Sequence, residues 1–214
     1  MSFKDQVQDV QTVDVARGND GDTAVYWRNG QIVNVMDPSN PRKKTQVTEP
    51  GFWYTPDKFH VDPTALVGAG FEPVSLYDDE DGHSALTLKV AYIGHRSQAF
   101  SVLELPGGKK DQIWHDKWEP GLRIQTEVLA LVDGLDYPVV LRLKGMASAA
   151  VTKKNVGILH QFRSGLLKDA VKLAGRKLND WTFWLPLTGA VDAKGQPVFS
   201  KTDQGGGYSP LVLA

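Results

Sequence analysis

Alternation of apolar and polar side chains between residues 85 and 144 constrains the fold of this chain most strongly. In one run, Leu141 and Leu143 fall on one side while Arg142 and Lys144 fall on the other. Side chains of a β-strand point to opposite faces in turn, so this pattern predicts strands with one buried side. The segments that show the pattern are 85–92, 99–105, 122–132 and 137–144.

A single amphipathic helix is predicted after these strands, over about 153–174. Thr152 is suited to cap its start, and Gly175 to end it. Apolar residues recur at spacings of three and four, which places them in one stripe on a helix. The stripe consists of Val156, Leu159, Phe162, Leu166, Ala170 and Leu173.

Shorter signals complete the order of elements. Asn29-Gly30 between two β-prone runs predicts a two-residue hairpin turn. Five prolines in 37–64 predict a long loop, which the aromatic residues 52–54 would anchor together with Phe59. The polar stretch 94–98 predicts a turn between two strands. After the helix, alternation returns in a strand at 181–187, and a short strand follows at 197–200.

This order favours a mainly β fold, an OB-like five-stranded Greek-key barrel with one helix between late strands. The alternatives are another small mixed β-barrel or an α+β sandwich. We expect residues 1–84 to form an N-terminal arm, with the hairpin and the proline-rich loop, packed on the barrel. Residues 85–200 would form the barrel domain, and residues 201–214 a flexible tail.

Composition narrows the class of protein. The 214 residues contain no cysteine, so disulfides and thiol chemistry are excluded. The N-terminus lacks the basic start and apolar run of a signal peptide, and no stretch approaches the length of a membrane span. We expect a protein of the cytoplasm of a bacterium or phage-infected cell, without a membrane partner. The formal net charge of −1 argues against coating duplex DNA through bulk charge.

Motifs for catalysis are missing from the sequence. The five histidines form no HExxH or HxH pair, and there is no nucleophile elbow, Walker loop or dinucleotide fingerprint. A metal site at His60 with Asp62, or at His83 with the acidic run 78–81, is the alternative that the sequence leaves open. We therefore expect a protein that is not an enzyme and that uses neither cofactor nor metal.

Outward-facing polar residues give the main functional hypothesis. Basic side chains would contact phosphates, while an exposed ring would stack on unpaired bases. The first group of candidate nucleic-acid-binding residues is Arg123, Gln125, Arg142, Lys144 and Trp184. A second group is Tyr92, His95, Arg96, Trp114, Lys117 and Trp118. The structural alternative is that the cations are solvated surface and that the arm covers Trp184.

A resemblance supports this hypothesis. The stretch LRIQTEVLALVDGLDYPVVLRLKGMAS, the helix, and LNDWTFWLPLTG resemble OB-fold single-stranded DNA-binding proteins of phages and plasmids, over about residues 85–190. The resemblance implies coating of single strands in replication or recombination, largely independent of base sequence. The chain departs from the common bacterial proteins because it ends in SPLVLA and not in an acidic tip, which puts partner recruitment by that route in doubt.

Other functions stay open at this point. Exposed tryptophans on a barrel also stack on sugar rings, so a carbohydrate- or protein-binding module is the main alternative. A phage structural or assembly protein, in which the arms lock into neighbouring copies, is the third. RNA is an alternative to DNA as the bound strand, and a monomer and a dimer are both compatible with the sequence.

Overall fold

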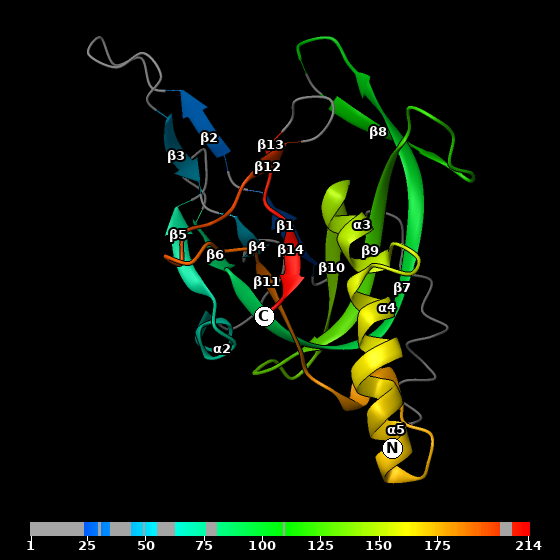
Figure 1. Ribbon diagram of the computed structural model, residues 1–214. Helices are drawn as coiled ribbons and strands as arrows, with labels where there is room; N and C mark the ends of the chain where they lie inside the picture. The colour runs from blue at the N-terminus through cyan, green and yellow to red at the C-terminus, as the bar shows by residue number, and fades with distance from the viewer. Residues whose placement is uncertain are drawn as a thin grey trace.

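The computed structural model describes residues 24–29, 31–34, 44–48, 50–54, 63–75, 81–108, 110–201 and 207–214. The fold is mainly β, as the alternation predicted (Figure 1). The strands are β1 Ala24–Arg28, β2 Gln31–Asn34, β3 Lys44–Thr48, β4 Gly51–Tyr54, β5 Glu72–Ser75, β6 Asp81–Ala85, β7 Thr87–Glu104, β8 Lys110–His115, β9 Arg123–Val132, β10 Pro138–Lys144, β11 Leu185–Gly189, β12 Ser200–Lys201, β13 Gly207–Tyr208 and β14 Leu211–Leu213. The helical segments are α2 Pro63–Gly68, α3 Met146–Thr152, α4 Ile158–Phe162, the π-helix η3 Arg163–Leu167, α5 Lys168–Ala174 and the 3₁₀ helix η4 Asp180–Thr182.

One large sheet of ten strands dominates the fold. Its order is β14-β11-β7-β9-β10-β1-β4-β6-β5, and β8 pairs with the far half of β7. The β1–β10 pair is parallel while the other pairs are antiparallel, so the sheet is mixed and open at β14 and β5. The pairs β2–β3 and β12–β13 form two small sheets of their own.

The central strands follow the predicted alternation in part. Leu141 and Leu143 are buried, whereas Lys144 is exposed. The predicted turn at 94–98 is wrong, because β7 continues through this segment and stays paired with β9 as far as Phe100. A β-bulge between Tyr92 and Gly94 shifts the register there. A bulge bends the strand without ending it, so polar residues in this stretch did not mark a loop.

The predicted helix is correct in place but not in form. Helix α3 begins earlier and ends at Thr152, whose hydroxyl donates to the carbonyl of Ser148 at 2.9 Å, so Thr152 does not cap the start of a helix. A turn over 153–157 then separates α3 from the continuous run α4–η3–α5. This run ends as expected at Gly175, which adopts φ 63°.

Only part of the predicted apolar stripe is buried. Leu159 and Phe162 belong to the core, but Val156, Leu166 and Leu173 are exposed. The end of α5 extends away from the sheet (Figure 1), which accounts for the exposure of Leu173. Among the described residues, no helix is both long and apolar enough to cross a lipid bilayer.

The N-terminal part of the chain contributes to the main sheet. The predicted hairpin at Asn29-Gly30 is not formed, because β1 pairs with β10 and β4, while β2 pairs with β3. Gly30 and Phe59 lie outside the described residues. The expected loop 37–64 contains β3 and β4, and its aromatic triplet is buried as part of β4. The three aromatic side chains are therefore part of a strand and of the core.

The two ends of the predicted barrel domain also differ from expectation. Trp181 and Thr182 lie in η4, so the strand near 181–187 starts only at Leu185. Leu211–Leu213 was expected in a free tail but forms β14, which pairs with β11 and buries Leu211. Strands from both sides of residue 84 therefore share one sheet and one core.

Candidate functional site

A polar cavity of about 400 Å³ opens on one face of the large sheet. Gln125 and Glu127 of β9 point into it, whereas the intervening Thr126 points the other way and hydrogen-bonds Ser148 of α3. The cavity therefore lies on the face opposite α3. Its lining residues are Tyr26, Arg96, Gln98, Asp111, Gln112, Trp114, Gln125, Glu127, Arg142 and Lys144.

Strand register arranges much of this lining in two rows across the sheet. In the first row, Arg96 of β7 lies opposite Glu127, which lies opposite Arg142 of β10 and then Tyr26 of β1. In the second row, Gln98 lies opposite Gln125, which lies opposite Lys144. Opposed residues share one face of a sheet, so residues far apart in the chain meet in the cavity.

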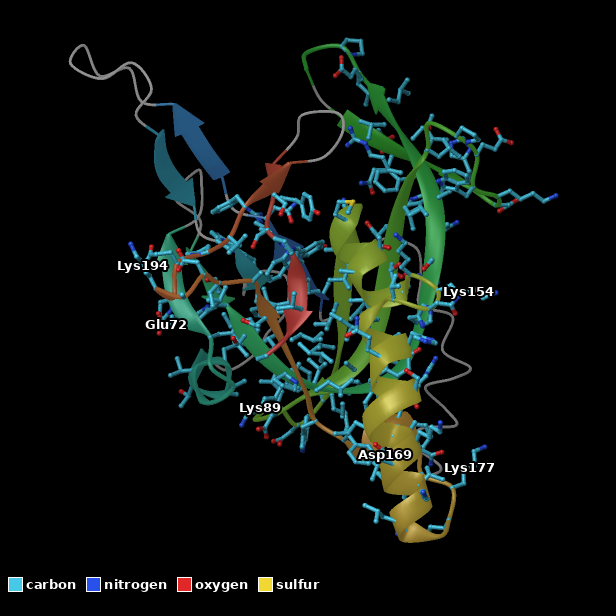
Figure 2. The ribbon with its side chains drawn as sticks, in the orientation of Figure 1. Glu72, Lys89, Lys154, Asp169, Lys177 and Lys194 are labelled. Atoms are coloured by element: carbon cyan, nitrogen blue, oxygen red, sulfur yellow. The ribbon has the colours of Figure 1, made fainter. Side chains whose placement is uncertain are left out.

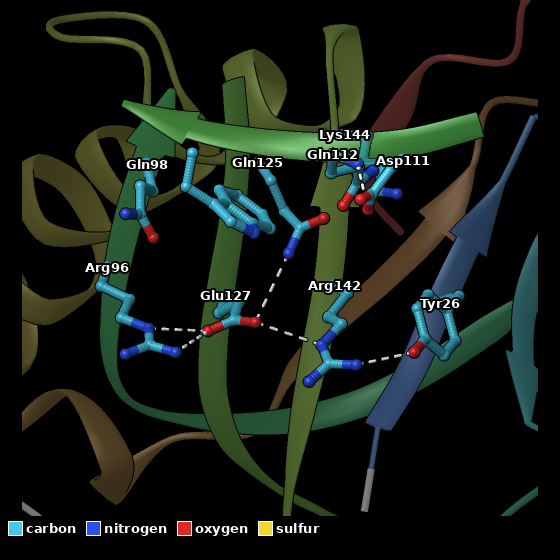
Figure 3. Close-up of a pocket in the computed structure, with 10 residues that line it drawn as sticks. Tyr26, Arg96, Gln98, Asp111, Gln112, Gln125, Glu127, Arg142 and Lys144 are labelled. Carbon is cyan, nitrogen blue, oxygen red and sulfur yellow. Dashed lines mark hydrogen bonds and ion pairs between the residues drawn. The ribbon is translucent and has the colours of Figure 1, made fainter. Parts of the chain in front are cut away.

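A network of ion pairs fixes the first row (Figure 3). One oxygen of Glu127 accepts from Nε of Arg96 at 2.7 Å and from its Nη2 at 2.6 Å. The other accepts from Nε of Arg142 at 3.1 Å and from the Gln125 amide at 3.4 Å. Nη1 of Arg142 donates to the Tyr26 hydroxyl at 2.7 Å. Such charge-assisted bonds hold side chains in one geometry.

The pKa values of two basic residues in the cavity, Arg142 and Lys144, shift in opposite directions. Burial opposes the charge of Arg142, but the Tyr26 hydroxyl and the Glu127 carboxylate outweigh it, and the pKa of Arg142 is raised. Burial, together with the nearby guanidinium groups of Arg142 and Arg123, lowers the pKa of Lys144. The Lys144 ammonium lies 5.6 Å from the centroid of the Phe100 ring. A cation in this setting gains from an added anion.

The β7–β8 hairpin forms a further wall of the cavity. Trp114 lies opposite Phe100 in the strand register, and the two ring centroids are 5.5 Å apart. The Trp114 side chain is half-buried and lines the cavity. Asp111 and Gln112 enter the lining from the same strand, so β8 contributes a carboxylate, an amide and an aromatic ring to the cavity.

The structure brings together about half of the predicted site residues. Arg123 is exposed at the start of β9, close enough to Lys144 to influence its pKa. Gln125 was expected on an open face but is 6% exposed, inside the cavity wall. The predicted residues that line the cavity are Arg96, Trp114, Gln125, Arg142 and Lys144.

Trp184 does not join this group, which corrects the expected arrangement. The indole is 49% exposed, so nothing seals it in the interior. It directly precedes β11, however, and β7 and β9 separate β11 from β10 in the sheet. Neighbouring strands lie about 4.8 Å apart, so Trp184 and Lys144 are not shoulder to shoulder.

The remaining predicted residues lie elsewhere. Tyr92 is buried in the core, and its hydroxyl lies 2.6 Å from Nδ1 of His95. Both belong to the sheet face that packs against the helices. Lys117 and Trp118 are exposed in the loop after β8, where the Trp118 indole donates to the carbonyl of Leu122 at 3.3 Å. This loop is outside the cavity lining.

Several lining residues were not predicted. Gln98 was assigned to a turn, and Asp111 and Gln112 follow a glycine-rich stretch without strand signals. Glu127 alternates with Gln125 on β9, so the period-two pattern already placed it on the same side. Tyr26 meets Arg142 only through the parallel β1–β10 pair, which joins segments more than a hundred residues apart. No local sequence signal reports such a pairing.

Within the described ranges, no group of three or more His, Asp or Glu side chains comes together. His83 is buried at 8% exposure in β6, and His60 is outside those ranges. Comparison of the chain with protein-family models, curated proteins and solved structures found no match.

Proposed function

We propose that this protein binds single-stranded DNA, without catalysis and largely independently of base sequence, through the cavity between β1 and the β7–β8 hairpin. One observation carries the proposal. Five residues that the sequence marked as nucleic-acid contacts line the same cavity, although they come from four strands. In this role the protein would act in cytoplasmic replication or recombination, where single strands arise.

The chemistry of the cavity suits a single strand. Lys144 and Arg142 offer positive charge to phosphates, and Arg123 lies next to them. The half-buried Trp114 offers a ring on which a base can stack. Glu127 holds two guanidinium groups in place, which lowers the entropy cost of ordering them around a ligand. Local placement of charge can support binding even when the net charge is −1.

We further propose that part of the large mixed sheet forms an OB-like barrel. Strand β4 pairs with β6, and only Leu86 separates β6 from β7. Strands β7, β9, β10 and β1 then pair in succession, and β1 pairs with β4. The helical run lies between β10 and β11, as in the expected order. Counted with β6 and β7 as one bent strand, these pairings support a five-stranded barrel within the larger sheet.

Replacement of Trp114 tests the proposal directly. Anisotropy of a labelled oligo-dT would be followed at low salt for the wild type, Trp114→Ala and Trp184→Ala. We expect Trp114→Ala to weaken binding by about 1–3 kcal/mol, the cost of losing one stacked base. Trp184→Ala is the matched control, because it removes an exposed indole outside the cavity. Absence of binding by the wild type, or an equal effect of both variants, would contradict the proposal.

A carbohydrate ligand is the second candidate, and the polar groups in the cavity lining favour it. Three glutamine amides and Asp111 line the cavity together with Trp114, and such groups bind sugar hydroxyls beside a stacking ring. Binding of a glycan would change little with salt, whereas binding of DNA weakens as salt rises.

The anisotropy titration, repeated with duplex DNA and with RNA, would establish which nucleic acid the cavity prefers.

A further inference from the structure

A second, smaller cavity of about 230 Å³ lies on the helix-facing side of β7. His95 enters it from β7, and this residue pairs with Val128, while the adjacent Arg96 faces the first cavity. The lining residues are His95, Thr152, Lys153, Lys154, Asn155, Leu159, His160 and Arg163. This set contains five basic or imidazole side chains and no carboxylate, so the cavity favours an anion.

The turn that carries the two lysines is rigidly built. The amide of Gly157 donates to the carbonyl of Lys153 at 2.8 Å, and Asn155 adopts a positive φ of 68°. A Cβ at Gly157 would lie 2.7 Å from the carbonyl oxygen of Val151, so only glycine fits against the end of α3. The turn therefore fixes the backbone that carries Lys153 and Lys154, both of which line the cavity. Figure 2 shows Lys154 beside β7.

The ring of His95 lies against the side chain of Tyr92, beside Arg163. The Arg163 guanidinium lies 5.3 Å from the Tyr92 ring centroid. The Tyr92 oxygen lies 2.6 Å from Nδ1 of His95, and which of the two donates depends on the tautomer of the imidazole. In the tautomer in which Tyr92 donates, His95 carries its proton on Nε2, which can donate to an anion.

Arg163 is anchored in the same way. Asp180 of η4 accepts from Nε of Arg163 at 2.8 Å and also from Nη2. Arg163 and Asp180 are brought together across 17 residues, which fixes the guanidinium beside the cavity. Because Asp180 occupies the Nε–Nη2 edge of the guanidinium, only the remaining nitrogen, Nη1, is left for an added phosphate oxygen.

We propose that this cavity binds a phosphate group, held by Lys153, Lys154 and Arg163 with hydrogen bonds from His95 and His160. The phosphate could belong to a free phosphate ligand or to a nucleic-acid backbone, and both present the same oxygens. The site is distinct from the polar cavity of the proposed function, because the two open on opposite faces of β7.

Calorimetric titration with pyrophosphate at low salt tests the site. We expect saturable binding by the wild type at millimolar ligand, and binding at least about tenfold weaker for Lys153→Gln/Lys154→Gln, which is about 1.4 kcal/mol. Lys172→Gln/Lys177→Gln is the matched control, since it removes two charges from the helix end outside the cavity lining, where Figure 2 shows Lys177. Imidazole resonances of His95 and His160 should shift with pyrophosphate in the wild type and in the control.

Absence of saturable binding, or equal weakening in both double variants, would overturn the proposal. Two further arms separate the sources of the phosphate. Competition of oligo-dT with pyrophosphate in the wild type would assign the site to a strand backbone, and independent binding of the two would assign it to a free ligand. Lys144→Gln should leave pyrophosphate binding unchanged, so failure of the first cavity to bind DNA is distinguishable from failure of this site.

Discussion

Glu127 is the residue on which the polar cavity depends most. Its carboxylate contacts two guanidinium groups and one amide, and it draws strands β7, β9 and β10 into one network. The side chains of Glu127 and Arg142 are only 13% and 14% exposed. At this depth solvent screens the pair weakly, so the pair matters more than a surface ion pair would.

Glu127→Gln is expected to destabilise the fold by about 2 kcal/mol, within the range of a hydrogen bond between charged groups. The amide keeps the shape of the side chain but leaves Arg142 with an uncompensated charge. Urea unfolding monitored by circular dichroism measures the change. Glu119→Gln, in the exposed loop before β9, should alter stability by no more than about 0.5 kcal/mol. Equal stability of the two variants would show that the network is not structural.

His95 predicts a pH dependence of stability. Burial and the positive charge of Arg163 lower the pKa of His95. Because the folded pKa lies below the unfolded value, the unfolded chain binds more protons between the two, so stability falls as pH drops through about 6.5. The charged or titratable groups that share the cavity with the ring are Lys153, Lys154, His160 and Arg163, and Asp180 is paired with Arg163.

Unfolding curves of the wild type and His95→Gln, recorded at about pH 7.5 and about pH 5.5, check this expectation. The wild type should lose more stability than the variant on acidification, since glutamine cannot take up the proton. The other four histidines are present in both proteins and cancel in the comparison. An identical loss in both would mean that His95 does not contribute.

Among the elements, β14 shows how the end of the chain is tied to the sheet. Leu213 lies opposite Leu187 of β11, and Leu211 is 3% exposed in the core. We expect Leu211→Ala to cost about 2–5 kcal/mol, as for other buried leucines. Leu173→Ala removes the same atoms from a side chain that is 90% exposed and should cost no more than about 0.5 kcal/mol. Thermal unfolding of the two variants gives the comparison.

The same elements show what the sequence could predict. Period-two alternation located β9 and β10, because each buries one face against a single core. It missed the middle of β7, where a bulge and polar residues hide a strand that stays paired with β9. It missed the separate helix α3, because the apolar stripe begins only at Val156, and the helix expected from about 153 starts at Ile158.

Of the candidate site, only the residues on strands adjacent in the sequence could be predicted. Arg142, Lys144 and Gln125 share a hairpin-like pair, β9–β10, whose faces follow from alternation. Trp184 was misplaced because strand order is a long-range property: β11 pairs with β7 on the far side of β9. Tyr26 was missed for the same reason, since parallel pairing with β10 has no local signature.

At the scale of the whole molecule, charge placement matters more than total charge. The chain carries a net charge of −1, yet cations gather in two cavities on opposite faces of β7. Binding of a single strand in the polar cavity would release counterions in proportion to the phosphates contacted. The slope of log affinity against log salt therefore measures how many cations of the protein contact phosphates of the DNA.

The most direct measurement is the affinity for oligo-dT over a series of salt concentrations, for the wild type, Lys144→Gln and Lys194→Gln. Loss of one phosphate contact should reduce the slope of log affinity against log salt by about 0.7 in Lys144→Gln. Lys194→Gln, in an exposed turn before β12, should keep the wild-type slope. Equal slopes in all three proteins, or no binding at low salt, would contradict the assignment of the polar cavity to single-stranded DNA.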